Sequence, residues 1–257
     1  RWLKDDQSPV KKAVQERFQL SDMLCTTKGQ VNVSMPGALS IMQENVNQLD
    51  EWASKRETFL SKGKKTVQAK MLDLLGLEGL PDHKIRIEAT GHDSMREYEQ
   101  YKFQLIREGE MPVPCILIIP SRANADSPVE LRLQEEGKGT YLSEYANFAA
   151  ALTEGKILLL ADLRGLGETT DPAFYTDAKY WNREYRNAMI SMHIGRPIMG
   201  QRVVDILTLL DFCSEHELLK GHSVKVFANG IYGPATIHAA YLDERINSVE
   251  ITHSVKT

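Results

Sequence analysis

The sequence predicts an α/β fold with a mostly parallel sheet and crossover helices, preceded by a helical N-terminal segment. After Pro81, short strand-like runs alternate with helix-like runs, which is the pattern of parallel strands joined by helices. Two of the strand-like runs, 113–120 and 157–161, are almost entirely apolar, as in strands buried on both faces. With 42% hydrophobic and 26% charged residues, the chain has the composition of a globular protein with a core.

The first 80 residues differ in character from the rest. Residues 20–33 contain a Thr-Thr-Lys-Gly turn between two short apolar pieces, which predicts a hairpin or an edge strand. Over 39–75 the apolar residues recur at helical spacing, and the charged run 62–65 predicts a solvated joint between two helices. We therefore expect a tail and helical segment over 1–80 and an α/β-hydrolase-like domain, partial at its C-terminal end, over 81–257.

The remaining elements follow from local periodicity and turn residues. Runs at 84–88 and 101–106 alternate polar and apolar residues, which indicates an antiparallel portion of the sheet. Further strands are predicted at 113–120, 129–133, 157–161, 224–227 and 246–252, and helices at 141–152, 199–213 and 234–242. The aromatic-rich stretch 168–198 has little periodicity and is equally consistent with a lid or pocket wall and with an ordinary surface excursion.

Charge and cysteine usage exclude several classes of partner and cofactor. A net charge of −4 gives no reason to expect nucleic acid, and no apolar run approaches the roughly 20 residues that a membrane helix needs. The three cysteines are far apart, so neither a disulfide framework nor a metal site is expected, and Cys115 and Cys213 are predicted to be buried thiols. No cofactor is predicted, because no glycine-rich phosphate motif follows a strand.

Three segments in order carry a resemblance to a known family. They are Asp162-Leu-Arg-Gly-Leu-Gly167, Gly195 to Asp205 with the pattern G-x-x-x-x-G-x-R-x-x-D, and Val224 to Ile246 with A-A-x-L-D-x-R-I at its end. Together they resemble the α/β-hydrolases, specifically acetyl xylan esterase-like hydrolases, over roughly residues 85–252. The stretch 27–31 is similar to a T-x-G-Q-V that follows one hydrolase module in longer chains. The resemblance implies a secreted or periplasmic carbohydrate esterase.

The resemblance also exposes a departure at the nucleophile elbow, the strand-to-helix turn on which such enzymes carry their serine. The spacing puts the nucleophile position on Gly230, and a slip by one residue would put it on Asn229 or Ile231. None of these is a nucleophile, and residues 224–243 contain no serine or cysteine. Glycine accepts the positive φ of an elbow but has no oxygen to form an acyl intermediate. Tyr232, in the second glycine position, is expected to crowd the start of the helix.

Other members of a catalytic site are equally hard to find. In this family the acid and the histidine follow the nucleophile, each after a later strand, and we expect the chain to be truncated before them. His253 comes too early for the role, and the other histidines are expected to be structural. By resemblance, Gly137 and Gly139 are candidates for an oxyanion loop, whereas their neighbours Glu135 and Glu136 are expected to lie in a solvated loop.

A pocket or lid is predicted from Arg164 at the turn after the strand 157–161 and from the aromatic side chains of Tyr175, Tyr180 and Trp181.

Three functions remain open from the sequence. The first is a catalytically incomplete hydrolase module within a larger esterase-like protein. The second is a fragment of an active serine carbohydrate esterase whose triad lies in another module. The third is a carbohydrate-binding or interaction module, with a carbohydrate ester as ligand. In each case we expect the last strand, 246–252, to be an open sheet edge covered by a further module or a partner chain.

Overall fold

The structure is a computed structural model that describes residues 18–172 and 183–254. The chain divides into two compact units, Arg1–Lys62 and Gly63–Thr257. The described part of the first unit contains a 3-10 turn and two helices: η1 (Leu20–Met23), α1 (Val31–Ser34) and α2 (Ile41–Leu60). The hairpin or edge strand predicted at 20–33 is therefore wrong. A local contact determines the structure of this segment. The Asp22 carboxylate accepts the Gln19 backbone N–H at 3.0 Å and closes a helical turn.

Helix α2 begins at a reciprocal capping box. The Ser40 hydroxyl accepts the backbone N–H of Gln43 at 3.2 Å, and the Gln43 side chain accepts the backbone N–H of Ser40 at 2.8 Å. The helix ends at Leu60, and the next helix, α3 (Lys64–Leu74), begins four residues later. The predicted pair of helices is thus confirmed, but the joint is shorter than the predicted 62–65, because Lys64 and Lys65 lie in the first turn of α3.

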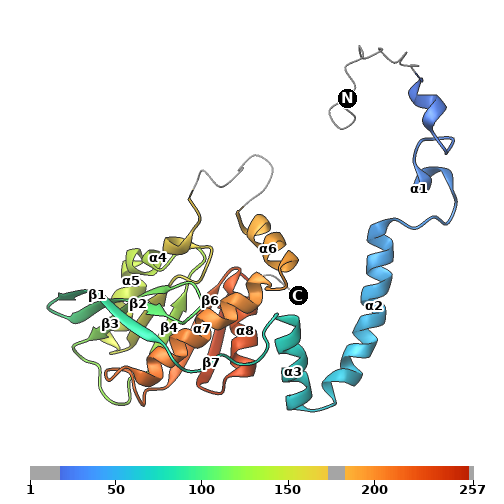
Figure 1. Cartoon of the computed structure of the whole chain (residues 1–257). Coiled ribbons are helices and arrows are strands. Elements are labelled where there is room, and N and C mark those ends of the chain that lie inside the picture. Colours follow the sequence, from blue (N-terminus) through green and yellow to red (C-terminus); the bar gives the residue numbers. More distant parts are fainter. Residues whose placement is uncertain (1–17, 173–182, 255–257) are drawn as a thin grey trace, which may run out of the picture. The chain divides into compact units, whose positions relative to one another are not determined.

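The second unit is built on a seven-stranded sheet of order β1-β2-β3-β5-β4-β6-β7 (Figure 1). The first three strands form an antiparallel meander whose third strand pairs antiparallel with β5, and β5, β4, β6 and β7 are mutually parallel. The strands are β1 (Arg86–Ser94), β2 (Tyr98–Ile106), β3 (Val113–Pro120), β4 (Val129–Leu133), β5 (Ile157–Ala161), β6 (Val224–Asn229) and β7 (Ile246–Thr252). Both the antiparallel portion and the parallel portion were expected from the alternating and the all-apolar runs.

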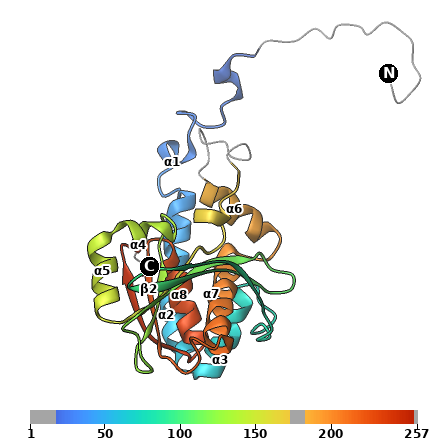
Figure 2. The same ribbon diagram turned by 90° about the vertical axis from the view of Figure 1, so that its left-hand side faces the viewer.

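Helices cover both faces of this sheet (Figure 2). On one face, α7 (Ile198–Glu215) and α8 (Tyr232–Leu242) pack on apolar side chains such as Leu131, Leu159 and Val226. On the other face, α4 (Gly139–Ser143) and α5 (Tyr145–Thr153) pack on Leu158 and Leu160. The predicted single helix over 141–152 is divided, because Glu144 leaves the helical region with ψ of 71°.

Two further features complete the second unit. Leu75, just after α3, is buried in the same core as the sheet, so α3 belongs with the sheet although the sequence grouped it with the N-terminal segment. The stretch 168–198 contains a 3-10 turn, η2 (Gly167–Thr169), and α6 (Arg183–His193), a helix that was not predicted. Across the described residues, no helix combines the length and apolarity needed to span a bilayer.

The two cysteines predicted to be buried, Cys115 and Cys213, are both in the core. Burial raises the pKa of both thiols, that of Cys213 to about 12, which makes them inert structural side chains.

Candidate functional site at the start of helix α8

Gly230 forms the sharp turn that joins β6 to α8. Its φ is +62°, a left-handed conformation that glycine adopts without steric cost. The turn is held to the neighbouring strand because the Gly230 N–H donates to the carbonyl of Thr252, at the end of β7, over 3.0 Å. The structure thus gives a strand–turn–helix with a positive φ at the residue to which the sequence assigns the nucleophile position.

Tyr232 is accommodated within α8 rather than crowding its start, since the helix begins at this residue. Its side chain is fully buried, and its hydroxyl donates to the Leu163 carbonyl at 3.1 Å, in the loop after β5. Burial raises the pKa of the phenol far above its usual range. The ring fills core volume beneath the turn, so the expected crowding does not occur.

The carboxylate of Glu135 occupies the space beside Gly230. Its Oε2 atom accepts the backbone N–H of Ile231 at 3.1 Å. A Cβ atom placed on Gly230 would lie only 1.6 Å from the same oxygen, far inside any allowed contact. The expectation of a solvated loop is therefore wrong for Glu135, whereas Glu136 is exposed as expected.

The position of Glu135 follows from strand pairing. In the parallel register of β4 and β6, Leu133 lies opposite Ala228. The residue two positions after Leu133 therefore emerges beside the residue two positions after Ala228, which brings Glu135 next to Gly230. Sequence reasoning missed this contact because it did not pair these two strands.

The two glycines proposed for an oxyanion loop have other surroundings. Gly137 has a φ of +101° and donates its N–H to the Gln134 carbonyl at 3.0 Å, closing a turn. A Cβ on Gly137 would face Gly167 and Asp162 of the turn after β5, and one on Gly139 would meet open space. The loop side chain that reaches the start of α8 is Glu135, and the oxyanion role of the glycines stays a prediction.

The turn after β5 is held by two buried carboxylates, beginning with Asp162. This side chain accepts the backbone N–H groups of Lys138 at 2.6 Å and Glu168 at 2.9 Å, and it pairs with the Lys138 ammonium at 2.7 Å. Burial disfavours the charge on Lys138, but its hydrogen bonds to Asp162 and Glu168 outweigh that effect and raise its pKa. Asp162 thereby ties the loop that carries Glu135 to the turn after β5.

The second carboxylate is Asp205 of α7, which binds Arg164. It accepts the Arg164 backbone N–H at 3.0 Å and its Nε at 2.9 Å, while the other end of the guanidinium donates to Gln201 at 2.9 Å. Burial disfavours the guanidinium charge, but the hydrogen bond to Asp205 keeps the pKa of Arg164 above its usual value. The arginine predicted for a pocket is therefore fixed in place by the fold.

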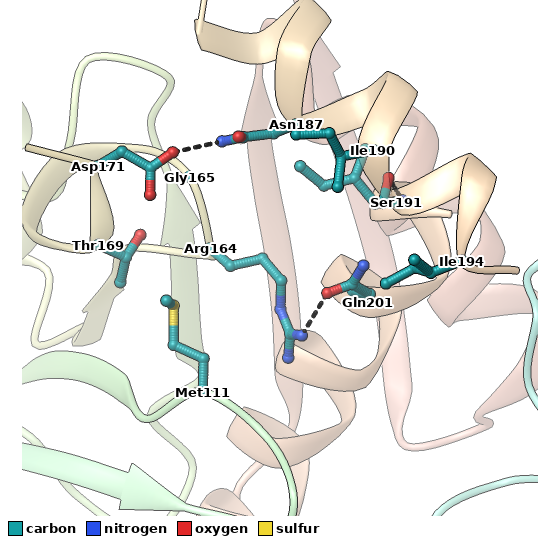
Figure 3. Close-up of a pocket in the computed structure, with 11 residues that line it drawn as sticks. Met111, Arg164, Gly165, Thr169, Asp171, Asn187, Ile190, Ser191, Ile194 and Gln201 are labelled. Atoms are coloured by element: carbon teal, nitrogen blue, oxygen red, sulfur yellow. Dashed lines mark hydrogen bonds between the residues drawn. The ribbon is translucent and has the colours of Figure 1, made fainter. Parts of the chain in front are cut away.

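Arg164 borders a cavity of about 220 Å³ between the turn after β5 and α6 (Figure 3). Asp171 accepts the Asn187 amide across this cavity at 3.0 Å. The other lining residues are Met111, Gly165, Thr169, Ile190, Ser191, Ile194, Ile198 and Gln201. Tyr175, Tyr180 and Trp181, which the sequence also assigned to a pocket or lid, lie outside the described residues.

The residues that flank Gly230, and His238 and His253 near them, have structural contacts. Asn229 donates its side-chain amide to Thr252 Oγ1 at 3.3 Å and lies 3.5 Å from the Nδ1 of His253, whereas Ile231 contributes its backbone N–H to Glu135. His238 bonds the Pro234 carbonyl one turn earlier in α8 at 2.6 Å. Within residues 18–172 and 183–254, no group of three or more histidine, cysteine or acidic side chains is placed to hold a metal ion.

Comparison with solved structures gives the same fold. One is a protein of Bacteroides fragilis NCTC 9343 proposed to be an acetyl xylan esterase, with a TM-score of 0.60 and 14% identity, covering 72% of this chain and 51% of that one. Another is acetyl xylan esterase 1 of Thermoanaerobacterium sp. JW/SL YS485, with a TM-score of 0.50 and 16% identity, covering 72% and 56%. The chain thus spans about half the length of these proteins.

No protein-family model and no curated protein matches the sequence of this chain. The likeness to the two solved structures extends over 72% of this chain. The part of the chain that they cover therefore has the α/β-hydrolase fold.

Proposed function

We propose that this chain is a catalytically incomplete α/β-hydrolase module, which keeps the fold of an esterase without its nucleophile and forms a non-catalytic part of a larger esterase-like protein. The observation that carries the proposal is Gly230 at the strand-to-helix turn, where a serine would be needed to form an acyl intermediate. Residues 224–243 contain no serine or cysteine that a small shift of the turn could bring there.

The electrostatics of the turn support the same proposal. In an elbow, the N–H of the residue after the nucleophile helps to stabilise the oxyanion of the tetrahedral intermediate. Here that N–H belongs to Ile231 and is already bound by the Glu135 carboxylate. A resident negative charge would repel a developing oxyanion, so the site disfavours the transition state of ester hydrolysis even apart from the missing nucleophile.

Fluorophosphonate labelling with mapping of the modified peptide tests the proposal. We expect no labelled serine in the wild-type chain and no hydrolysis of p-nitrophenyl acetate above background, with a known serine esterase as positive control. The Gly230→Ser variant is also expected to be inactive. A specifically labelled serine within this chain, or turnover by Gly230→Ser, would refute the proposal.

Carbohydrate binding is a second candidate function, favoured by the cavity beside Arg164. Both solved structures described above carry the name of acetyl xylan esterases, and this cavity combines apolar side chains with the amide of Asn187. Titration with acetylated xylo-oligosaccharides, followed by NMR, is expected to shift resonances of Ile190 and Asn187. The response should be lost in Asn187→Ala and kept in the control Asn247→Ala, which lies outside the cavity; no shift at all would reject this candidate.

A further inference from the structure

The contact between Glu135 and the start of α8 fills the space beside Gly230 and the Ile231 N–H. One oxygen of the carboxylate is 3.1 Å from the Ile231 nitrogen. The same oxygen takes the place that a side chain on Gly230 would need. Gly230 is itself buried, and Glu135 is half-buried, so the contact is partly shielded from water.

The chemistry of the contact favours a negative group. Ile231 is the N-cap of the 11-residue helix α8, so its N–H has no partner within the helix, and the helix dipole adds positive potential there. A carboxylate satisfies both the hydrogen bond and the charge. The neighbouring Glu136, on the same loop, is exposed and makes no hydrogen bond among the described residues, so loop composition alone does not explain why Glu135 is bound.

Gly230 and Glu135 are sterically dependent on each other. With Glu135 bound, any Cβ at position 230 would overlap its oxygen. Without a side chain at 230, a void would remain beside the Ile231 N–H unless a group from elsewhere entered it. The glycine at 230 and the carboxylate of Glu135 therefore fill this space together.

We infer that Glu135 is a built-in ligand of this turn, a carboxylate plug that occupies the position of the acid product of an ester hydrolysis. The inference rests on the proposed function, because it takes the turn to be a degenerate nucleophile elbow. The inference has a specific consequence. Truncating Glu135 creates a binding site for a small monocarboxylate such as acetate, which accepts a hydrogen bond from the Ile231 N–H.

Thermal unfolding of the full chain in sodium acetate and in sodium chloride of equal ionic strength tests the inference. We expect Glu135→Ala to lower Tm by roughly 4–8 °C and acetate to restore part of this loss in a saturable way. The wild type and the matched control Glu136→Ala should not respond to acetate beyond the chloride effect. An equal acetate response in all three proteins, or none in Glu135→Ala, would overturn the inference.

A conservative variant keeps the test decisive if Glu135→Ala fails to fold. Glu135→Gln retains the shape of the side chain and loses its charge. We expect the Ile231 amide proton to move upfield in Glu135→Gln and to stay in place in Glu136→Gln, because only the former weakens a charge-assisted bond. An unchanged Ile231 resonance in Glu135→Gln would refute the plug, whereas turnover by Gly230→Ser would refute the proposed function and leave these readouts unaffected.

Discussion

Truncating different side chains of this protein is expected to lower the free energy of unfolding by very different amounts, and the expected effect is large for Asp205. It is buried and holds both the backbone and the guanidinium of Arg164. Asp205→Ala leaves a buried arginine without its main partner, so we expect the free energy of unfolding to fall by about 3–5 kcal/mol, as measured by urea denaturation. Asp126→Ala, at an exposed carboxylate, should change it by no more than about 0.5 kcal/mol. Equal effects of the two variants would contradict this assignment.

His216 gives the stability a dependence on pH. Its ring packs against Phe103 and Phe212 at centroid distances of 5.3 and 4.9 Å, and burial lowers its pKa below 6.5 in the folded state. The unfolded state therefore binds a proton more readily, and the stability contributed by the neutral ring is present above about pH 6.5 and lost as the pH falls. We expect the free energy of unfolding to decrease from pH 7.5 to 5.5, and to decrease less in His216→Gln. The same slope in both proteins would rule out this histidine as the cause.

At the scale of elements, α2 depends on its N-terminal cap because none of its residues is buried. The reciprocal Ser40–Gln43 contacts satisfy backbone groups of its first turn. Ser40→Ala should destabilise the helix by about 1 kcal/mol, seen as faster amide hydrogen exchange in the first turn of α2 in the full chain. Ser54→Ala, in the middle of the same helix, serves as the control, and equal exchange in both variants would contradict the role of the cap.

Elements with uniform burial could be predicted from the sequence, and those set by single contacts could not. The strands at 113–120, 129–133 and 157–161 have the predicted bounds, because each is an apolar run between turn residues and is buried in the core. The segment 20–33 was mistaken for a hairpin since its turns depend on local side-chain caps. The site could be predicted only in part: Gly230 follows from motif spacing, whereas Glu135 requires the register of two strands that are far apart in sequence.

At the scale of the whole molecule, β7 is an edge of the sheet. Among the described residues it pairs with β6 alone, and most of its side chains are exposed. Open edges of this kind invite pairing with another strand, so we propose that a further module or a partner chain covers β7. In the chain alone, the β7 amides that do not face β6 should exchange with solvent far faster than those of β6. Slow exchange of all β7 amides in a monomeric sample would contradict an open edge.

The overlap between a side chain at 230 and the carboxylate of Glu135 also couples the two positions energetically. A serine at 230 requires the Glu135 carboxylate to move from its present place. The cost of Gly230→Ser should therefore be smaller when Glu135 has already been truncated, and a double-mutant cycle of Gly230→Ser with Glu135→Ala should give a coupling free energy different from zero.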